Sequence, residues 1–230
     1  MPLSTLIAEF VQQKLNQNNQ NEIYGWAVNG NFLPDGIVIQ GTNNLELNLS
    51  LKHSLHRAWI NAENNQQRRG DLIQYYISIW GGIRGNSAQT MNIYRNADSD
   101  TLISRGLTGI ASWSKALVLH NPDSYAIYDV RVVAAINYLQ LLNENLEERR
   151  RFAIISGGRN RRINQANSLI NANNLYENWV VLPAVSLYTE SYLPLLRESA
   201  QLINTNISTI EMILFNNAPL LAEQIIERYD

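Results

Sequence analysis

Apolar side chains recur at helical spacing along most of the chain. Between residues 3 and 16 they fall at Leu3, Leu6, Ile7, Phe10, Val11 and Leu15, the stripe of a helix that packs on one face. Comparable patterns predict helices over 49–62, 70–80, 129–143 and from near Pro194 to Asn204, with a more polar one over 158–173. The last predicted helix, 208–229, opens with Ser208 and Glu211 at capping-box spacing. The pattern indicates an all-α protein.

Two segments break this pattern. Residues 27–48 are rich in asparagine and glycine and include the stretch GIVIQG, so we expect a loop or a short strand pair appended to the helices. Residues 80–87, WGGIRGNS, form a break punctuated by glycine. Because no linker, repeat or heptad run divides the chain, we expect one helical domain over residues 1–230.

The composition narrows the classes of protein. With 230 residues, 45% of them hydrophobic, the chain can bury a substantial core. The absence of cysteine excludes disulfides, thiolate zinc sites, iron–sulfur clusters and cysteine nucleophiles. The first fifteen residues are unlike a signal peptide, and no apolar run approaches the roughly 18 residues of a membrane span. We therefore expect a cytoplasmic protein with no membrane partner.

The charge distribution permits a nucleic-acid partner without arguing for one. The net charge is −2, whereas neutralisation of phosphates usually supplies much of the affinity for DNA. Positive charge gathers at 149–151 and again at Arg159, Arg161 and Arg162. Such runs are either solvated helix faces or a locally basic face that contacts a few phosphates.

The segment 106–137 carries the most chemistry. A glycine turn leads into a short helix with Lys115, and Asp129 then opens a second apolar helix. Of 18 basic residues only three are lysines, the others being Lys14 and Lys52. An amine nucleophile requires lysine, because arginine does not deprotonate in proteins. An aspartate at a helix start either caps free N–H groups or stabilises positive charge that develops in a reaction.

This order of hairpin, lysine and aspartate resembles the helix-hairpin-helix DNA glycosylases, in particular their 8-oxoguanine glycosylase-like bacterial branch. Leu107-Thr108-Gly109-Ile110-Ala111 resembles the family's L-P-G-V-G turn, with threonine for proline and Ala111 for the second glycine. The stretch from Ala126 to Arg131 resembles the family's V-D-x-H element, with Arg131 where histidine is common. The resemblance covers about residues 100–140, and it implies a helical bundle whose two lobes share one cleft.

The resemblance implies an enzyme that flips a modified base out of double-stranded DNA. Lys115, or a water in its place, then attacks C1′ while Asp129 stabilises the transition state, and AP lyase strand cleavage follows if Lys115 reacts. Counted from Gly109, the family's lysine position falls on Trp113, as in monofunctional members that use aspartate and water. Ser114-Lys115 instead resembles the S/T-K pair of the 8-oxoguanine branch, so both chemistries stay open.

The same resemblance implies residues that hold DNA and the flipped base. Gly109, Ala111 and Arg131 are expected at the DNA backbone, with Trp80, Arg84 and Trp113 at the base pocket or wedged into the duplex. Other aromatic candidates are Tyr75, Tyr76, Trp179 and Tyr188. No cofactor is implied, and no metal, because His53 and His56 lack a third ligand pattern.

The substrate stays open at this stage. The family default is a damaged purine such as 8-oxoguanine, removed by a monomeric enzyme in base excision repair. A phage-defence glycosylase that removes hypermodified cytosines would need a roomier pocket. The alternative in a different class is a non-catalytic helix-hairpin-helix module that only binds DNA.

Overall fold

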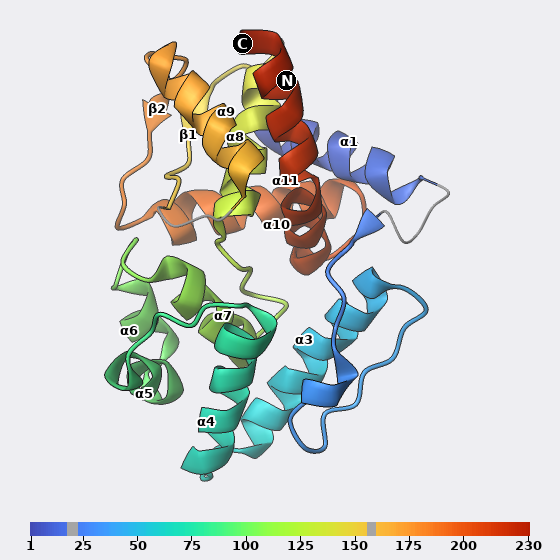
Figure 1. The fold of residues 1–230 in the computed structure, drawn as a ribbon, viewed down its shortest axis with the longest axis vertical. Coiled ribbons are helices and arrows are strands. Elements are labelled where there is room, and N and C mark those ends of the chain that lie inside the picture. Colours follow the sequence, from blue (N-terminus) through green and yellow to red (C-terminus); the bar gives the residue numbers. More distant parts are fainter. Residues whose placement is uncertain (18–22, 156–159) are drawn as a thin grey trace. The chain divides into compact units, whose positions relative to one another are not determined.

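A computed structural model describes residues 1–17, 23–155 and 160–230 of the chain. Within these ranges the protein is mostly helical, with ten α-helices and one tiny parallel sheet of two strands (Figure 1). The expected helical fold is thereby confirmed. The chain forms two compact units, one from Met1–Ile23 with Tyr128–Asp230 (unit 1) and one from Tyr24–Ile127 (unit 2). No helix in the described ranges is long and apolar enough to cross a bilayer.

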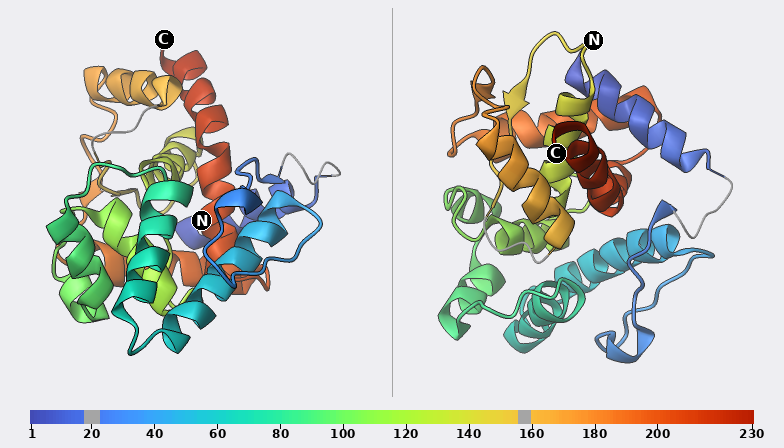
Figure 2. Two further views of the ribbon diagram at one scale, coloured as in Figure 1. Left: turned by 60° about the horizontal axis from the view of Figure 1, so that its bottom comes forward. Right: turned by 45° about the horizontal axis from the view of Figure 1, so that its top comes forward.

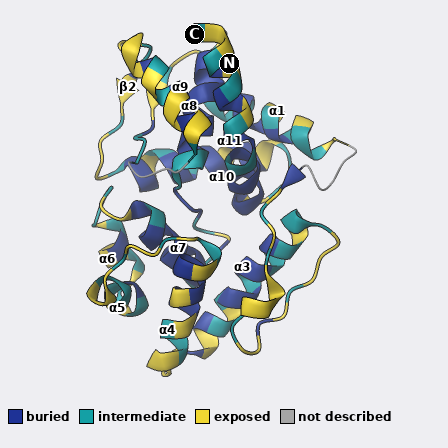
Figure 3. Cartoon of the chain, in the orientation of Figure 1, coloured by how far each residue is buried: buried dark blue, intermediate teal, exposed yellow. Residues whose placement is uncertain are grey.

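Unit 1 is built around its longest helix. Its α-helices are α1 (Leu3–Leu15), α8 (Val130–Leu142), α9 (Arg161–Ala172), α10 (Leu193–Leu202) and α11 (Ile207–Tyr229), and a π-helix η3 (Leu187–Tyr192) precedes α10. α11 runs beside α8 and α9, and α1 packs on α10 (Figures 1 and 2). Every residue of α8 from Val132 to Leu141 is buried, which makes this helix the centre of the unit's core (Figure 3).

Unit 2 encloses the helix that carries Lys115. Its elements are the 3₁₀ turn η1 (Gly30–Phe32), α3 (Asn44–Asn61), α4 (Gln66–Gln74), the π-helix η2 (Tyr75–Trp80), α5 (Ala88–Asn96), α6 (Ser99–Ile103) and α7 (Ile110–His120). Helix α7 packs against α3, α5, α6 and η2. Because neighbours cover it on several sides, every residue from Ser112 to Leu119 is buried.

Polar caps set two helix starts that the apolar pattern misplaces. Helix α3 begins at Asn44, earlier than predicted, because the Asn43 side chain accepts a hydrogen bond from the Glu46 N–H at 3.0 Å. For α11 the predicted capping box is wrong. Asn206 caps this helix by accepting from the Thr209 N–H at 2.8 Å, and Ser208 and Glu211 are both buried inside the helix.

Of the two forms expected for residues 27–48, the loop is observed, because this segment consists of loop, η1 and the first residues of α3. The two strands lie elsewhere, where β1 (Arg150–Arg151) and β2 (Val180–Val181) pair in parallel. Helices α5 and α6 are not predicted by the apolar pattern. They are short, and Ser87 and Asp98 cap them by accepting from the N–H groups of Thr90 and Thr101.

Candidate active site

A glycine hairpin joins α6 to α7. Gly106 and Gly109 both have left-handed backbones, with φ of 54° and 71°, and Gly109 is the N-cap of α7. A Cβ added at Gly109 would lie 2.7 Å from the hydroxyl oxygen of Tyr94. Both the backbone and the space therefore favour glycine at this position. Gly109 is exposed and Ala111 half-buried, which leaves the start of α7 accessible to a phosphate.

Trp113 holds the hairpin from inside the protein. Its side chain is fully buried, and its indole N–H donates to the carbonyl of Gly106 at 3.1 Å. The sequence suggests this residue for a base pocket. In the structure its indole N–H stabilises the turn of the hairpin.

Lys115 is buried on α7, one and a half turns beyond Gly109. Only 3% of its surface is exposed, and its Nζ donates to the carbonyl oxygen of Ala111 at 2.8 Å. Lysine is rarely buried to this extent unless its ammonium group is paired, so the position is unusual for a solvated surface lysine. The side chain runs past Gly81, where an added Cβ would lie 2.7 Å from the Lys115 Cε.

The close approach at Gly81 depends on the π-helix η2. The Gly81 N–H donates to the carbonyl of Tyr76 at 3.1 Å, the wider spacing of a π-turn. Gly82 then turns the chain with a left-handed φ of 68°. A Cβ at Gly81 would lie 2.8–2.9 Å from the carbonyl oxygens of Ile77 and Tyr76. The end of η2 thus leaves room for a lysine stem only while residue 81 is glycine.

Asp129 is the N-cap of α8 in unit 1. It is half-buried and has an extended backbone, and its Oδ1 accepts from the Arg131 N–H at 2.9 Å. The guanidinium of Arg131 lies over the ring of Phe215, 4.7 Å from its centroid. This cation–π contact holds the guanidinium of Arg131 within unit 1.

Tyrosines surround the start of α8. The hydroxyl of Tyr128 donates to the carbonyl of Ala153 at 2.7 Å, and its ring meets that of Tyr192 edge to face at 4.9 Å. Burial raises the pKa of Tyr192 well above its ordinary value, and the charges of Glu211 and Asp129 act in the same direction. The Tyr192 hydroxyl therefore stays neutral at physiological pH beside Asp129.

Trp80 and Arg84 lie at a hollow in unit 2. Trp80 is half-buried, stacks on Tyr76 with ring centroids 4.6 Å apart, and donates from its indole N–H to Asn48 Oδ1 at 2.9 Å. Arg84 is exposed on the loop that follows. The hollow also includes Trp26 and Phe32, which the sequence analysis missed because residues 24–33 have no periodic pattern.

The other aromatic candidates mostly pack in cores. Tyr75 and Tyr76 are buried in η2, and burial raises the pKa of Tyr75 to about 12, which keeps its hydroxyl protonated. In unit 1, Trp179 packs on Tyr176 at 4.7 Å, and Tyr188 stacks on Tyr192 at 5.7 Å. Of the predicted set, Trp80 alone combines partial exposure with a place at a hollow.

The two candidate histidines are engaged separately on α3. His56 Nδ1 donates to the carbonyl of Leu119 at 2.9 Å, whereas His53 lies 3.9 Å from Asp123 near the surface. In the described part of the chain, no three histidine, cysteine, aspartate or glutamate side chains are grouped to hold a metal ion.

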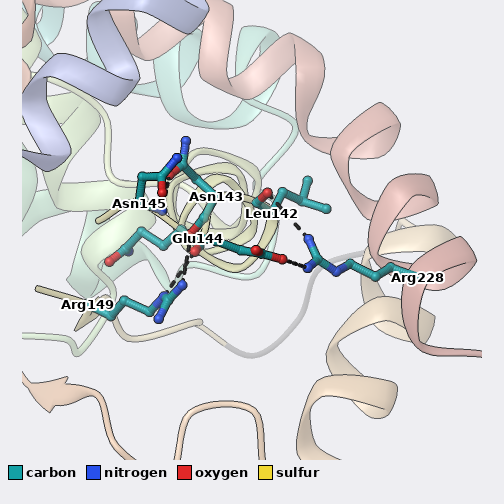
Figure 4. Close-up of polar contacts among 7 residues, drawn as sticks. Leu142, Asn143, Glu144, Asn145, Arg149 and Arg228 are labelled. Atoms are coloured by element: carbon teal, nitrogen blue, oxygen red, sulfur yellow. Dashed lines mark hydrogen bonds and ion pairs between the residues drawn. The ribbon is translucent and has the colours of Figure 1, made fainter. Parts of the chain in front are cut away.

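The first arginine cluster serves the structure of unit 1. At the end of α8, Arg149 donates to the carbonyl of Gln140 at 3.2 Å. It also donates to the carbonyl of Asn143 at 2.9 Å (Figure 4). Arg228 reaches the same end from α11, where it pairs with Glu144 at 2.5 Å (Figure 4). Such contacts satisfy the free carbonyls of a helix C-terminus.

The remaining arginines of the two clusters differ in their contacts. Arg151 lies over the ring of Tyr176 at 5.0 Å, and Arg150 pairs with Glu148. In the second cluster, Arg162 pairs with Glu223 at 2.7 Å, Arg161 is exposed, and Arg159 lies outside the described residues.

The predicted site residues therefore divide between the units. Unit 2 holds the hairpin, Lys115, Trp80 and Arg84, and unit 1 holds Asp129 and Arg131. No family model matches the chain, and neither a curated protein nor a solved structure matches it. Functional inference therefore starts from the side chains themselves.

Proposed function

We propose that the protein is a DNA N-glycosylase with Lys115 as its nucleophile and Asp129 as its electrostatic partner. The observation that carries the proposal is the buried Lys115 beyond the Gly106–Gly109 hairpin. In a helix-hairpin-helix, backbone N–H groups at the turn anchor a phosphate without reading sequence. Helix α7 begins at this hairpin and carries Lys115. The lysine is therefore held at a fixed, short separation along the chain from the residues that would bind the phosphate.

In the proposed reaction, the neutral Nζ of Lys115 leaves the Ala111 carbonyl and attacks C1′ of the flipped nucleotide. The bond from Nζ to C1′ forms as the bond from C1′ to the base nitrogen breaks. The base leaves with the bonding electrons and takes up the proton that the alkylated amine gives up. The sugar ring opens when the C1′–O4′ bond breaks and O4′ takes a proton from water, which turns the Nζ–C1′ adduct into a Schiff base. Removal of a proton from C2′ then forms a C2′=C3′ double bond and expels the 3′ phosphate.

Asp129 supplies negative charge as C1′ becomes positive in the transition state. Its Oδ1 is oriented by the Arg131 N–H, so the carboxylate is held in one position at the start of α8. In the monofunctional variant of this reaction, the same carboxylate orients a water that attacks C1′.

The test is borohydride trapping on duplexes that each contain one modified base, with 8-oxoguanine and glucosylated hydroxymethylcytosine in the panel. We expect a covalent adduct that is lost in Lys115→Gln and retained in Lys14→Gln and Lys52→Gln, the chain's other lysines. Peptide mapping of the adduct should place it on Lys115. Asp129→Asn should lower the trapping rate by at least about a hundredfold.

Each other outcome points to a different function. Base release without trapping would move the attack to water and Asp129. A preference for the glucosylated base would support the phage-defence alternative. Binding of duplexes with no base release from any of them would contradict the proposal and favour a non-catalytic DNA-binding module.

A further inference from the structure

A hollow of about 540 Å³ opens on unit 2 between residues 26–32 and the face of η2. Pockets that bind small molecules usually enclose about 300–1,000 Å³, so this one has room for a planar ring system. Lys115 does not line it. The walls of the hollow include the side chains of Trp26, Asn29, Phe32, Gln74, Trp80 and Arg84.

Two tryptophans give the hollow flat apolar walls. The rings of Trp26 and Trp80 meet edge to face, with centroids 6.5 Å apart and an interplanar angle of 70°. The hydrogen bond to Asn48 and the stack on Tyr76 fix the Trp80 ring before any ligand arrives. A fixed ring loses little side-chain entropy when another ring stacks on it.

Apolar side chains at the same hollow are left in water. Phe32 is 59% exposed and Ile79 is 50% exposed, although both are large and hydrophobic. Clustered exposure of this kind beside a hollow marks a surface that a ligand covers. A ligand that fills the hollow would contact both side chains, because both line it.

The polar groups of the hollow suit the edge and the phosphate of a nucleotide. Gln74 is an exposed amide that offers a donor and an acceptor side by side, as a base edge does. Asn29 is also exposed, and because its Oδ1 accepts from the Asn31 N–H at 3.0 Å, its amide contributes mainly the NH₂ donor. Among the residues that the structure describes, Arg84 is the one charged residue that lines the hollow, and none of the acidic ones lines it. A Cβ added at Gly82 or Gly85 would meet nothing within 4 Å, so the loop around Arg84 is open to an approaching strand.

We propose that this hollow binds one unpaired nucleobase of DNA, stacked on the tryptophan walls, with the adjoining phosphate on Arg84. The choice of DNA as the ligand rests on the proposed function. Stacking supplies the affinity because every base has an aromatic face, and the two amides adjust the preference among bases. The site is distinct from the buried amine of Lys115.

The experiment compares two short duplexes that differ at one bulged nucleotide, a thymidine in one and a tetrahydrofuran abasic residue in the other. Fluorescence anisotropy measures their binding to full-length Lys115→Gln, which prevents turnover. We expect the thymidine duplex to bind about tenfold more tightly. Adding Phe32→Ala should remove most of this difference, and adding Arg84→Ala should weaken both duplexes alike. Ile60→Ala is the matched control, because Ile60 is 55% exposed on α3 and does not line the hollow.

Equal binding of the two duplexes, or no binding of either, would overturn the inference. So would a Phe32→Ala protein that behaves as Ile60→Ala does. These results are separate from the trapping assay. Trapping by the wild type without a thymidine preference would leave the glycosylase proposal standing and remove the hollow from it. If instead Phe32→Ala abolishes the thymidine preference and no duplex is trapped, the hollow would stand as a base-binding site and the glycosylase proposal would fall.

Discussion

The Cε atom of Lys115 occupies the space in which a side chain at residue 81 would begin. A Cβ added at Gly81 would lie 2.7 Å from that atom and within 2.9 Å of two backbone carbonyl oxygens of η2. The lysine stem could bend away at little cost, but the carbonyls of Tyr76 and Ile77 cannot move without disturbing the π-turn. The position of the amine is therefore coupled to the shape of η2.

Gly81→Ala should displace Lys115 and strain η2. We expect a loss of about 1–3 kcal/mol in the free energy of unfolding, as for other overpacked sites, measured by urea titration. On a duplex that the wild type traps, the trapping rate should fall by about tenfold or more, because small misplacements of a reacting group are costly. Gly85→Ala is the control, since a Cβ there meets nothing within 4 Å. Equal behaviour of the two variants would contradict the coupling.

Gly109→Ala should destabilise the hairpin more than Gly82→Ala does. Both residues have a left-handed φ, near 70°, which costs an alanine about 1–2 kcal/mol. Only at Gly109 does the added Cβ also meet an atom, the Tyr94 hydroxyl at 2.7 Å. The midpoints of urea unfolding measure the difference. Tyr94→Phe should recover part of the extra loss in a double-mutant cycle, and additive losses would show that the hydroxyl is not the cause.

His120 should make unit 2 sensitive to acid. Burial lowers the pKa of His120 to about 4, with Arg69 acting in the same direction and Asp98 opposing it. The unfolded chain takes up a proton near pH 6.5 that the folded protein refuses, so stability is full above pH 6.5 and falls as the pH drops toward about 4. The loss should be on the order of 2–3 kcal/mol.

The measurement for His120 is the free energy of unfolding across this pH range, for wild type and His120→Gln. The variant should lose less stability on acidification, although it also gives up the stack of His120 on Trp59, whose centroids lie 5.2 Å apart. Parallel pH profiles for the two proteins would rule out His120 as the acid-sensitive group.

Arg149 and Arg161 should separate stability from DNA affinity. Arg149→Ala removes the donor to two carbonyls at the end of α8, and we expect unfolding to become easier by about 1–2 kcal/mol. Arg161→Ala removes an exposed charge, so stability should change by less than about 0.5 kcal/mol. If Arg161 contacts a phosphate, its variant should also show a shallower salt dependence of DNA binding. An Arg149→Ala protein of unchanged stability would contradict the capping role.

Helix α8 shows how far the sequence predicts this fold. The predicted range, 129–143, matches Val130–Leu142 with Asp129 as its cap, because a strong N-cap directly precedes a long apolar run. The start of α3 is hidden, because Leu45, Leu47 and Leu49 alternate with polar residues, which is the spacing of a strand and not of a helix. Residues 70–80 read as one helix, whereas the structure changes from α4 to a π-helix there. Apolar spacing does not encode that extra residue per turn.

As with the fold, some features of the candidate site can be predicted from the sequence and others cannot. Helix α7 is buried from Ser112 to Leu119, although Ser112, Ser114 and Lys115 interrupt its apolar run. The burial of Lys115 therefore depends on the neighbouring helices, which the sequence of α7 alone does not indicate. Tryptophan is a residue type that suits a base pocket, which is why the sequence suggests Trp113. Its hydrogen bond to Gly106 depends on how the hairpin folds back, which the sequence does not show. Trp26 and Phe32 could not be assigned, because their place at the hollow arises from tertiary contact with η2.

The division of the chain into units also fixes an order of assembly during synthesis. Unit 2 is one continuous segment, Tyr24–Ile127, so all of its helices leave the ribosome before α8 begins. Helix α1 precedes unit 2 in the chain, but the helices on which it packs, α8, α10 and α11, are made after the whole of unit 2. Its buried side chains, among them Ile7 and Val11, therefore stay without their native neighbours until unit 2 has been synthesised. Because a short isolated helix is only marginally stable in water, α1 gains its stability late, from helices that follow more than a hundred residues after it.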